Sequence, residues 1–306
     1  MTYTRNIFRK PLLLLPVLAA IGFMFSTPMI LDVAADHTGG ELPDPPDNAL
    51  LPDVTPGIPT HLHVHNQGQG EWLRFTNTWA NVGDGSLEFQ VGPVVEDKQI
   101  AFQNLYDDAG NFANIYVEEP PYVYHEPLGE FIFHPGHNHW HIDDVGDFSV
   151  WEFDDPNPDV MGDEIPTVAA PGASSVKIGF CIIDVFRWDE TKSSPSSEKI
   201  YWDCEVDLQG IQPGWADQYH QSVEGNEIDV SAIPDGEYLL IHEWNPEGLF
   251  IDEDDSNNRS WVIFTLEQDN NGNGNRKATV TGGFAPECDV DGGTTPAICG
   301  DLHKNS

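Results

Sequence analysis

The chain has 306 residues, with 13 basic residues against 51 acidic ones and a formal net charge of −38. This length suits one large domain or two small ones. The acidic residues are spread along the sequence, which leaves no basic face for a phosphate backbone and excludes nucleic acid as a partner. We interpret the charge as a salt-adapted, strongly solvated surface typical of halophiles, with attraction of cationic substrates as the alternative.

Residues 1–35 have the pattern of an export signal. A basic start, Arg5 to Lys10, precedes an apolar stretch, and Val33-Ala34-Ala35 offers small residues for cleavage. The apolar stretch is also long enough to span a bilayer, although Pro16 and Pro28 would weaken a continuous helix. We therefore predict a secreted, extracellular protein, with a membrane anchor as the alternative to a cleaved signal peptide.

The rest of the chain is predicted to be all-β. Residues 36–48 are acidic, Pro-rich and without periodicity, which indicates a linker. Segments rich in Val, Ile, Phe and Trp are then predicted as strands: Trp72–Asn81, Leu87–Val91, Phe148–Phe153, Val176–Asp184, Glu237–Glu243 and Trp261–Leu266. The run Asn81-Val-Gly-Asp-Gly85 predicts a turn that supplies left-handed positions. With 24 prolines and 28 glycines, long loops are expected on an antiparallel β-sandwich core.

The strands point to one domain over residues 49–267. An Asn/Gly-rich spacer and a cysteine-clipped tail are expected at residues 268–306. The chain has four cysteines, which are Cys181, Cys204, Cys288 and Cys299. An even count in an exported chain predicts disulfides, and sequence proximity favours Cys181–Cys204 and Cys288–Cys299 among the three pairings that four cysteines allow.

A histidine-rich run predicts a metal site in the long loops. It contains His134, His137, His139 and His141. Alternate side chains of an extended segment point to one face, and imidazoles gathered there suit copper, zinc, nickel or iron. The spacing alone does not name the metal. The segment Thr60–His65 repeats the alternation, and we interpret it as a polar strand face, with a second metal site as the alternative.

The histidine run resembles the copper-binding segment of lysyl oxidases, in which a His-x-His-x-His core binds Cu(II). Other segments resemble parts of the same catalytic domain, in the same order: Trp72–Glu88, Val176–Cys181, Gln209–Tyr219, Glu227–Leu239 and Asp252–Asn258. Together with the acidic composition, this ordered set identifies the chain as a member of the lysyl oxidase family, prokaryotic and haloarchaeal, over roughly residues 50–267.

The resemblance implies that His137, His139 and His141 bind copper. Zinc is the generic alternative for three imidazoles. It also implies that Lys177 and Tyr219 join covalently to form lysine tyrosylquinone. Taken alone, Lys177 reads equally well as a strand-end lysine reaching water, and Tyr219 as an ordinary half-buried tyrosine.

The activity that the resemblance implies is oxidation of a primary amine, small or on a protein lysine, to an aldehyde. Oxygen is the oxidant, and hydrogen peroxide and ammonia are released. The general base stays open among Asp143, Asp144, Asp147 and His220, since Val150 stands where a histidine is common. The alternatives are a non-catalytic extracellular copper-binding module and a structural domain with adventitious metal.

An acidic loop near residue 255 has the oxygen ligands that Ca²⁺ prefers, on Asp252, Asp254, Asn257 and Asn258. Some relatives add an aspartate near the start of the domain, which Asp53 would supply here. A solvated acidic turn is the alternative. Asn258 also begins a glycosylation sequon, a use that would oppose a ligand role.

Overall fold

The computed structural model describes residues 42–67, 70–95, 98–107, 122–134, 139–153, 171–204, 207–223, 225–269, 276–288 and 299, with the backbone alone at residues 67, 95, 98, 134 and 171–178. The chain divides into two units, Met1–Ala34 and Ala35–Ser306, and every described residue belongs to the second. The expected leader at 1–35 and His137 lie outside the described residues and stay predictions. Within the described ranges, no helix has the length and apolar character needed to cross a membrane.

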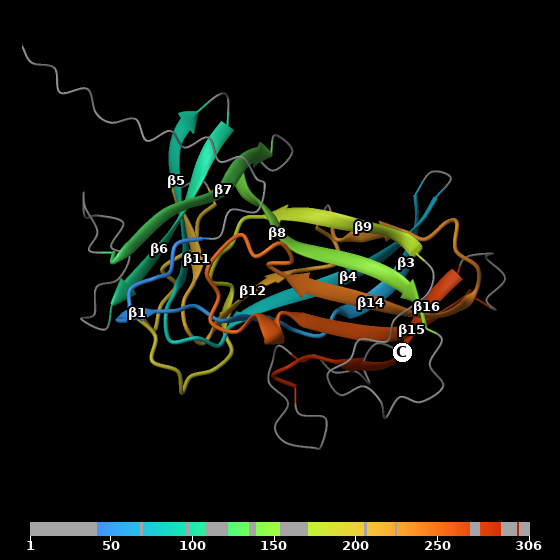
Figure 1. Cartoon of the computed structure of the whole chain (residues 1–306). Coiled ribbons are helices and arrows are strands. Elements are labelled where there is room, and N and C mark those ends of the chain that lie inside the picture. Colours follow the sequence, from blue (N-terminus) through green and yellow to red (C-terminus); the bar gives the residue numbers. More distant parts are fainter. Residues whose placement is uncertain are drawn as a thin grey trace, which may run out of the picture. The chain divides into compact units, whose positions relative to one another are not determined.

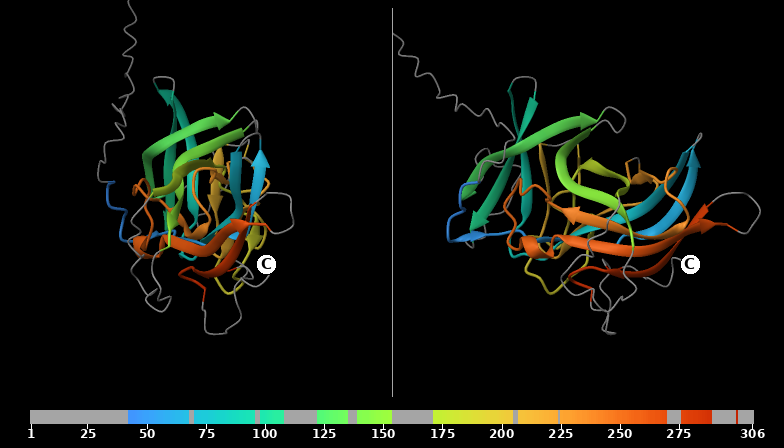
Figure 2. Two further views of the ribbon diagram at one scale, coloured as in Figure 1. Left: turned by 90° about the vertical axis from the view of Figure 1, so that its right-hand side faces the viewer. Right: turned by 45° about the vertical axis from the view of Figure 1, so that its right-hand side comes forward.

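The described strands form two antiparallel sheets (Figure 1). The larger sheet has ten strands in the order β11-β5-β6-β7-β8-β14-β15-β16, with β1 paired to β6 and β9 paired to β8. These strands are β1 (Ala49–Leu50), β5 (Leu87–Val95), β6 (Lys98–Asp107), β7 (Tyr124–His134), β8 (His139–Glu152), β9 (Pro171–Phe180), β11 (Leu208–Ile211), β14 (Gly236–Trp244), β15 (Arg259–Gln268) and β16 (Arg276–Phe284). The strands β5 and β6 run steeply across the direction of β14 and β15, as Figure 2 shows from two sides.

The smaller sheet has six strands, in the order β10-β12-β4-β13, and β2 and β3 also pair with β4. Its strands are β2 (Val54–Pro56), β3 (Thr60–Gln67), β4 (Gly70–Asn81), β10 (Phe186–Arg187), β12 (Trp215–Tyr219) and β13 (Glu227–Asp229). A 3-10 turn, η2 (Asp255–Asn257), precedes β15.

Aromatic side chains fill the space between the two sheets. Phe75 on β4 packs on Phe148 of β8 at a ring-centroid distance of 4.9 Å. Trp79, also on β4, contacts Phe180 at 4.3 Å and Trp244 at 4.8 Å. All five residues are fully buried, so each removes a large apolar surface from water. The predicted all-β sandwich of antiparallel sheets is confirmed.

The turn after β4 differs from its prediction. The strands β4 and β5 belong to different sheets, so residues 81–85 cross between sheets and close no hairpin. No residue from 81 to 85 has a positive φ, and the prediction of left-handed positions there is wrong. A Cβ at Gly83 would lie 2.4 Å from the Asp53 nitrogen, and one at Gly85 would lie 2.2 Å from the Leu50 oxygen. These glycines are needed because another backbone segment passes close by.

Other predictions agree more closely with the structure. The predicted strands Glu237–Glu243 and Trp261–Leu266 lie within β14 and β15, whereas Val176–Asp184 keeps strand pairing only as far as Phe180. The segment expected as a tail contains β16, which pairs with β15 along its length. Disulfides join Cys181 to Cys204 and Cys288 to Cys299, the pairing favoured by sequence proximity.

Candidate functional site

Two histidines of the predicted metal site lie at the start of β8. The rings of His139 and His141 are 4.9 Å apart between centroids, and both residues are partly buried. The backbone of His134, at the end of β7, pairs with His139. Alternate positions on one strand therefore bring these imidazoles together, as the sequence pattern predicts.

The strand β9 runs close against this histidine strand at Gly179. A Cβ added at Gly179 would lie 3.1 Å from the Ile142 carbonyl oxygen and 3.4 Å from the His141 Cβ. The next residue, Phe180, is the Cα partner of Ile142. A larger residue at position 179 would have to displace the Ile142 backbone or the side chains of Asp143 and His141.

Lys177 lies on β9, two residues before Gly179, and its Cα partner on β8 is Asp147. The structure describes only the backbone here, so the position of the amine stays a prediction. The register nevertheless places Lys177 on the segment that touches both His141, through Gly179, and Tyr219, through Phe180.

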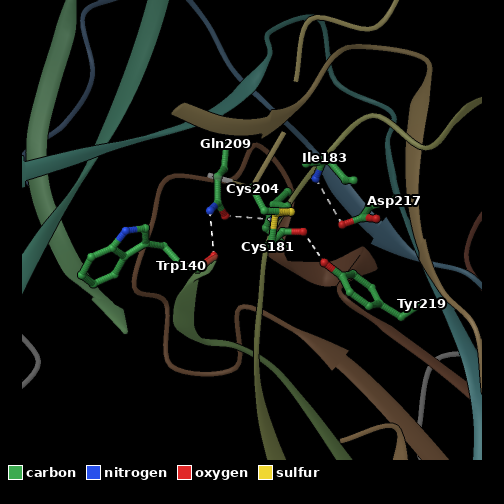
Figure 3. Close-up of a disulfide and its surroundings, with 8 residues drawn as sticks. Trp140, Cys181, Ile183, Cys204, Gln209, Asp217 and Tyr219 are labelled. Carbon is green, nitrogen blue, oxygen red and sulfur yellow. Dashed lines mark hydrogen bonds between the residues drawn. A yellow bond between two sulfur atoms is a disulfide. The ribbon is translucent and has the colours of Figure 1, made fainter. Parts of the chain in front are cut away.

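Tyr219 ends β12 and reaches the same segment from the other sheet. Its ring packs on Phe180 at 4.5 Å and on Trp79 at 6.3 Å between centroids. Its hydroxyl donates a hydrogen bond to the carbonyl oxygen of Cys181 (Figure 3). The phenol is thus fixed against residues 180–181, and burial, together with the nearby Asp217, raises the pKa of Tyr219 well above its ordinary value.

Gln209 connects the two halves of the site, although the sequence analysis gave it no role. Its Nε2 donates to the Trp140 carbonyl at 2.9 Å, and its Oε1 accepts from the Ile182 amide at 3.1 Å (Figure 3). Trp140 stands between the two histidines, and Ile182 follows Cys181. The fully buried Gln209 therefore holds the histidine strand in register with the segment that anchors Tyr219.

His242 on β14 is a second residue that the sequence analysis did not single out. It is fully buried, stacks on Phe148 at 4.4 Å, and accepts a hydrogen bond from the Trp79 indole through Nε2. Burial lowers the pKa of His242 to about 3, so the ring is neutral. Trp79 also contacts Tyr219, which places this neutral imidazole in the aromatic layer behind the phenol.

The candidates for a general base lie in different surroundings. Asp143 has Oδ1 near Gly179, Asp144 takes a positive φ of 56°, and Asp147 is the Cα partner of Lys177 in the pairing of β8 with β9. His220 is exposed. It lies beside His61 of β3, with the ring centroids 6.0 Å apart.

The three histidines in Thr60–His65 are exposed on β3. This exposure is what a polar strand face predicts. His61 sits at an irregularity in the pairing of β3 with β4 and has a positive φ of 54°.

The acidic loop closes on the start of the domain. Asn257 Nδ2 donates to Asp53 Oδ1 at 2.7 Å, and the Val54 amide donates to Asp252 Oδ1 at 2.9 Å. Asp254 caps η2 by accepting from the Ser256 amide at 2.9 Å. The predicted set around Asp53 is therefore one cluster in space.

Three oxygens of this cluster have no hydrogen-bond partner among the described residues. They are Asp252 Oδ2, Asn257 Oδ1 and Asn258 Oδ1. Burial, reinforced by the Asp53 and Asp255 charges, raises the pKa of Asp252 to about 7. Unpaired buried acceptors beside carboxylates are the donor set that Ca²⁺ takes.

Among the described residues, no three His, Cys, Asp or Glu side chains are arranged to hold one metal ion. In the acidic loop, two of the unpaired oxygens belong to asparagine amides, which lie outside that set. In the histidine site, two of the three expected ligands are described and His137 is not.

The structure defines an antiparallel β-sandwich with paired imidazoles on one sheet and a partly buried tyrosine from the other, both set against the strand β9. Residues 121–271 match the family model described as Lysyl oxidase. The match spans His139, His141, Lys177, Tyr219 and the acidic loop at residues 252–258. It supports the lysyl oxidase family, and with it a copper amine oxidase-like oxidoreductase. No curated protein matches the chain.

Proposed function

We propose that the protein is an exported copper-dependent amine oxidase whose organic cofactor is lysine tyrosylquinone, made from Lys177 and Tyr219. One primary amine, one O₂ and one water give one aldehyde, one ammonia and one hydrogen peroxide. The substrate class includes small amines and the side-chain amines of protein lysines.

The contact chain from His141 to Tyr219 carries this proposal. Gly179 lies against His141 and the adjacent Phe180 lies against the Tyr219 ring, so the imidazoles and the phenol flank the same few residues of β9. Lys177 is two residues away on that strand. Its place on this strand supports Lys177 as the partner of Tyr219.

The donor chemistry of the histidine segment fits copper. His139 and His141, with His137 as the expected third ligand, would hold the ion through imidazole nitrogens. Bound copper would supply the oxidation of the Tyr219 ring by O₂. The chain itself holds the Tyr219 ring in one orientation, through the Cys181 carbonyl and the rings of Phe180 and Trp79.

A non-catalytic copper-binding module is the second candidate. The observation that favours it is that Tyr219 is hydrogen-bonded to backbone and packed on two rings, as a purely structural tyrosine would be. This candidate predicts copper uptake without quinone absorbance and without peroxide release.

The two candidates separate in an assay of peroxide release from a primary amine after aerobic copper loading. We expect activity in the wild type and none in Lys177→Arg or Tyr219→Phe, because each change removes an atom of the cofactor. Lys277→Arg and Tyr122→Phe are matched controls away from the site and should keep activity. Full activity in either of the first two variants would overturn the quinone assignment.

We also propose that Ca²⁺ binds the cluster formed by Asp53, Asp252, Asp254, Asn257 and Asn258. The three unpaired oxygens support this, because a cation would satisfy acceptors that otherwise cost free energy when buried. Asn258 is only 5 % exposed, which argues against its use as a glycan acceptor.

Export is part of the proposal, through a signal peptide or an anchor at residues 1–35. Two disulfides support an oxidising compartment. The net charge of −38 supports adaptation to high salt, where a strongly hydrated acidic surface stays soluble.

A further inference from the structure

Asp217 is a buried carboxyl beside Tyr219 that the proposed reaction has not yet used. The two residues are separated by one position on β12, so both side chains face the interior, whereas Gln218 between them is exposed. Both point at the segment after β9: the Tyr219 hydroxyl donates to the Cys181 carbonyl, and Asp217 Oδ2 accepts from the Ile183 amide at 3.3 Å (Figure 3).

The second oxygen, Asp217 Oδ1, has no hydrogen-bond partner among the described residues, and the side chain is 1 % exposed. The charged neighbours are Asp184, which disfavours a charge on Asp217, and Lys199, which favours it. Asp184 is itself occupied, because it accepts from the Ile200, Tyr201 and Gln212 amides. Burying a carboxylate oxygen that has no hydrogen-bond partner costs free energy, so this position calls for an explanation.

Burial raises the pKa of Asp217 well above the usual range for a carboxyl. Burial also raises the pKa of Tyr219, and the charge of the nearby Asp217 raises that pKa further. A carboxylate of raised pKa is a stronger base than a carboxylate in water.

We infer that Asp217 is the proton acceptor for the Tyr219 hydroxyl when the ring is prepared for oxidation, an inference that rests on the proposed function. The proton moves from Tyr219 Oη to the Asp217 carboxylate, and the electron pair of the broken O–H bond stays on the ring oxygen. The step itself consumes no oxidant, and it leaves an electron-rich phenolate and a neutral carboxyl.

A purely structural role would not require a carboxylate at this position. An asparagine oxygen would accept from the Ile183 amide equally well and would avoid the cost of burying a charge. Asp217→Asn therefore keeps the size and the backbone contact and removes the capacity to take a proton together with the negative charge. Asp207→Asn, at an exposed position, is a control for the loss of one negative charge.

The test combines a titration with a rate. In metal-free protein, phenolate absorbance lost in Tyr219→Phe reports the ionisation of Tyr219. In Asp217→Asn this ionisation should shift to lower pH by about one unit or more, because a neighbouring charge is gone. In copper-loaded protein, the covalent join of Lys177 to Tyr219 should nevertheless form at least about 100-fold more slowly, the scale of general-base catalysis. Asp217→Glu should recover part of the rate.

These two effects have opposite directions, which separates the roles. If Asp217 acts only by opposing the ionisation of Tyr219 through its charge, Asp217→Asn would form the join between Lys177 and Tyr219 faster than wild type. A rate in Asp217→Asn equal to or above that of wild type and Asp207→Asn would overturn the inference while leaving the proposed function intact. Absence of the join in wild type would overturn the proposed function and this inference with it.

Discussion

The Gln209 side chain donates to the carbonyl oxygen of Trp140 at 2.9 Å, and Trp140 is the residue between the two described histidines. Because the same amide accepts from Ile182, one buried side chain links the imidazole strand to the segment that holds Tyr219. The geometry of the site therefore depends on a residue that touches neither the expected metal nor the expected cofactor.

Gln209→Leu should weaken copper binding and destabilise the fold. It leaves the Trp140 carbonyl and the Ile182 amide unpaired, at about 1–3 kcal/mol each, and outer contacts of this kind change metal affinity by about 10–100-fold. Copper titration and urea unfolding measure both effects. Gln268→Leu, at an exposed position, should change neither; equal behaviour of the two variants would contradict the role given to Gln209.

Gly179→Ala should destabilise the protein and disturb His141. The added methyl group would lie 3.1 Å from the Ile142 carbonyl oxygen, which cannot move without shifting β8. Gly129 on β7 is a matched control, because nothing lies within 4 Å of a Cβ added there. We expect Gly129→Ala to be neutral or slightly stabilising and Gly179→Ala to lower both the unfolding free energy and the copper affinity. A neutral Gly179→Ala would show that β9 is not packed closely against the backbone of Ile142 and the Cβ of His141.

The acidic loop should make stability depend on pH. Burial raises the pKa of Asp252 to about 7, so between about pH 4 and pH 7 the folded state binds a proton that the unfolded state has released. Stability from this group is present at low pH and lost as the pH rises through 7, by at most about 4 kcal/mol.

Denaturant unfolding between pH 4 and pH 8, without calcium, measures this loss. Asp252→Asn should remove it, whereas Asp229→Asn, at an exposed carboxyl, should keep it. Added Ca²⁺ should stabilise wild type more at pH 8 than at pH 5, because the ligand must be ionised. A calcium effect that is equal at both pH values, or unchanged in Asp252→Asn, would rule out the proposed site.

Removing the Cys181–Cys204 disulfide should affect both stability and the tyrosine. The bridged residues are 23 apart, and the chain-entropy model gives a loss of about 3 kcal/mol. Cys288 and Cys299 are 11 apart, so removing that bridge should cost slightly less. Because Tyr219 is anchored on the Cys181 carbonyl, only the Cys181→Ser, Cys204→Ser variant should also slow formation of the cofactor. Equal rates in both double variants would mean that the anchor does not need the bridge.

Sequence patterns predicted the fold class, because runs of β-branched and aromatic residues, as in β14 and β15, favour half-buried strands. They did not predict the path between sheets. The Gly83 and Gly85 pattern looks like a hairpin turn, but tertiary packing against Asp53 and Leu50 requires the glycines for space. The strand β16 was also missed, since its residues Arg276–Phe284 have little apolar alternation of their own.

The site was predictable where the chemistry is local and not where it comes from packing. Alternating histidines identify His139 and His141 because strand geometry alone brings them together. Asp217, Gln209 and His242 carry no such signal. An aspartate, a glutamine or a histidine in a strand is ordinary until the fold buries it, and burial at these positions arises from contacts more than 30 residues away in the chain, as between Gln209 and Trp140.

Peptide mass mapping of copper-loaded protein tests the central claim most directly. After aerobic loading, digestion should release one covalently joined species that contains the peptides bearing Lys177 and Tyr219. That species should be missing from metal-free protein and from Lys177→Arg. Recovery of the two peptides as separate, unmodified species from protein that has taken up copper would contradict the account.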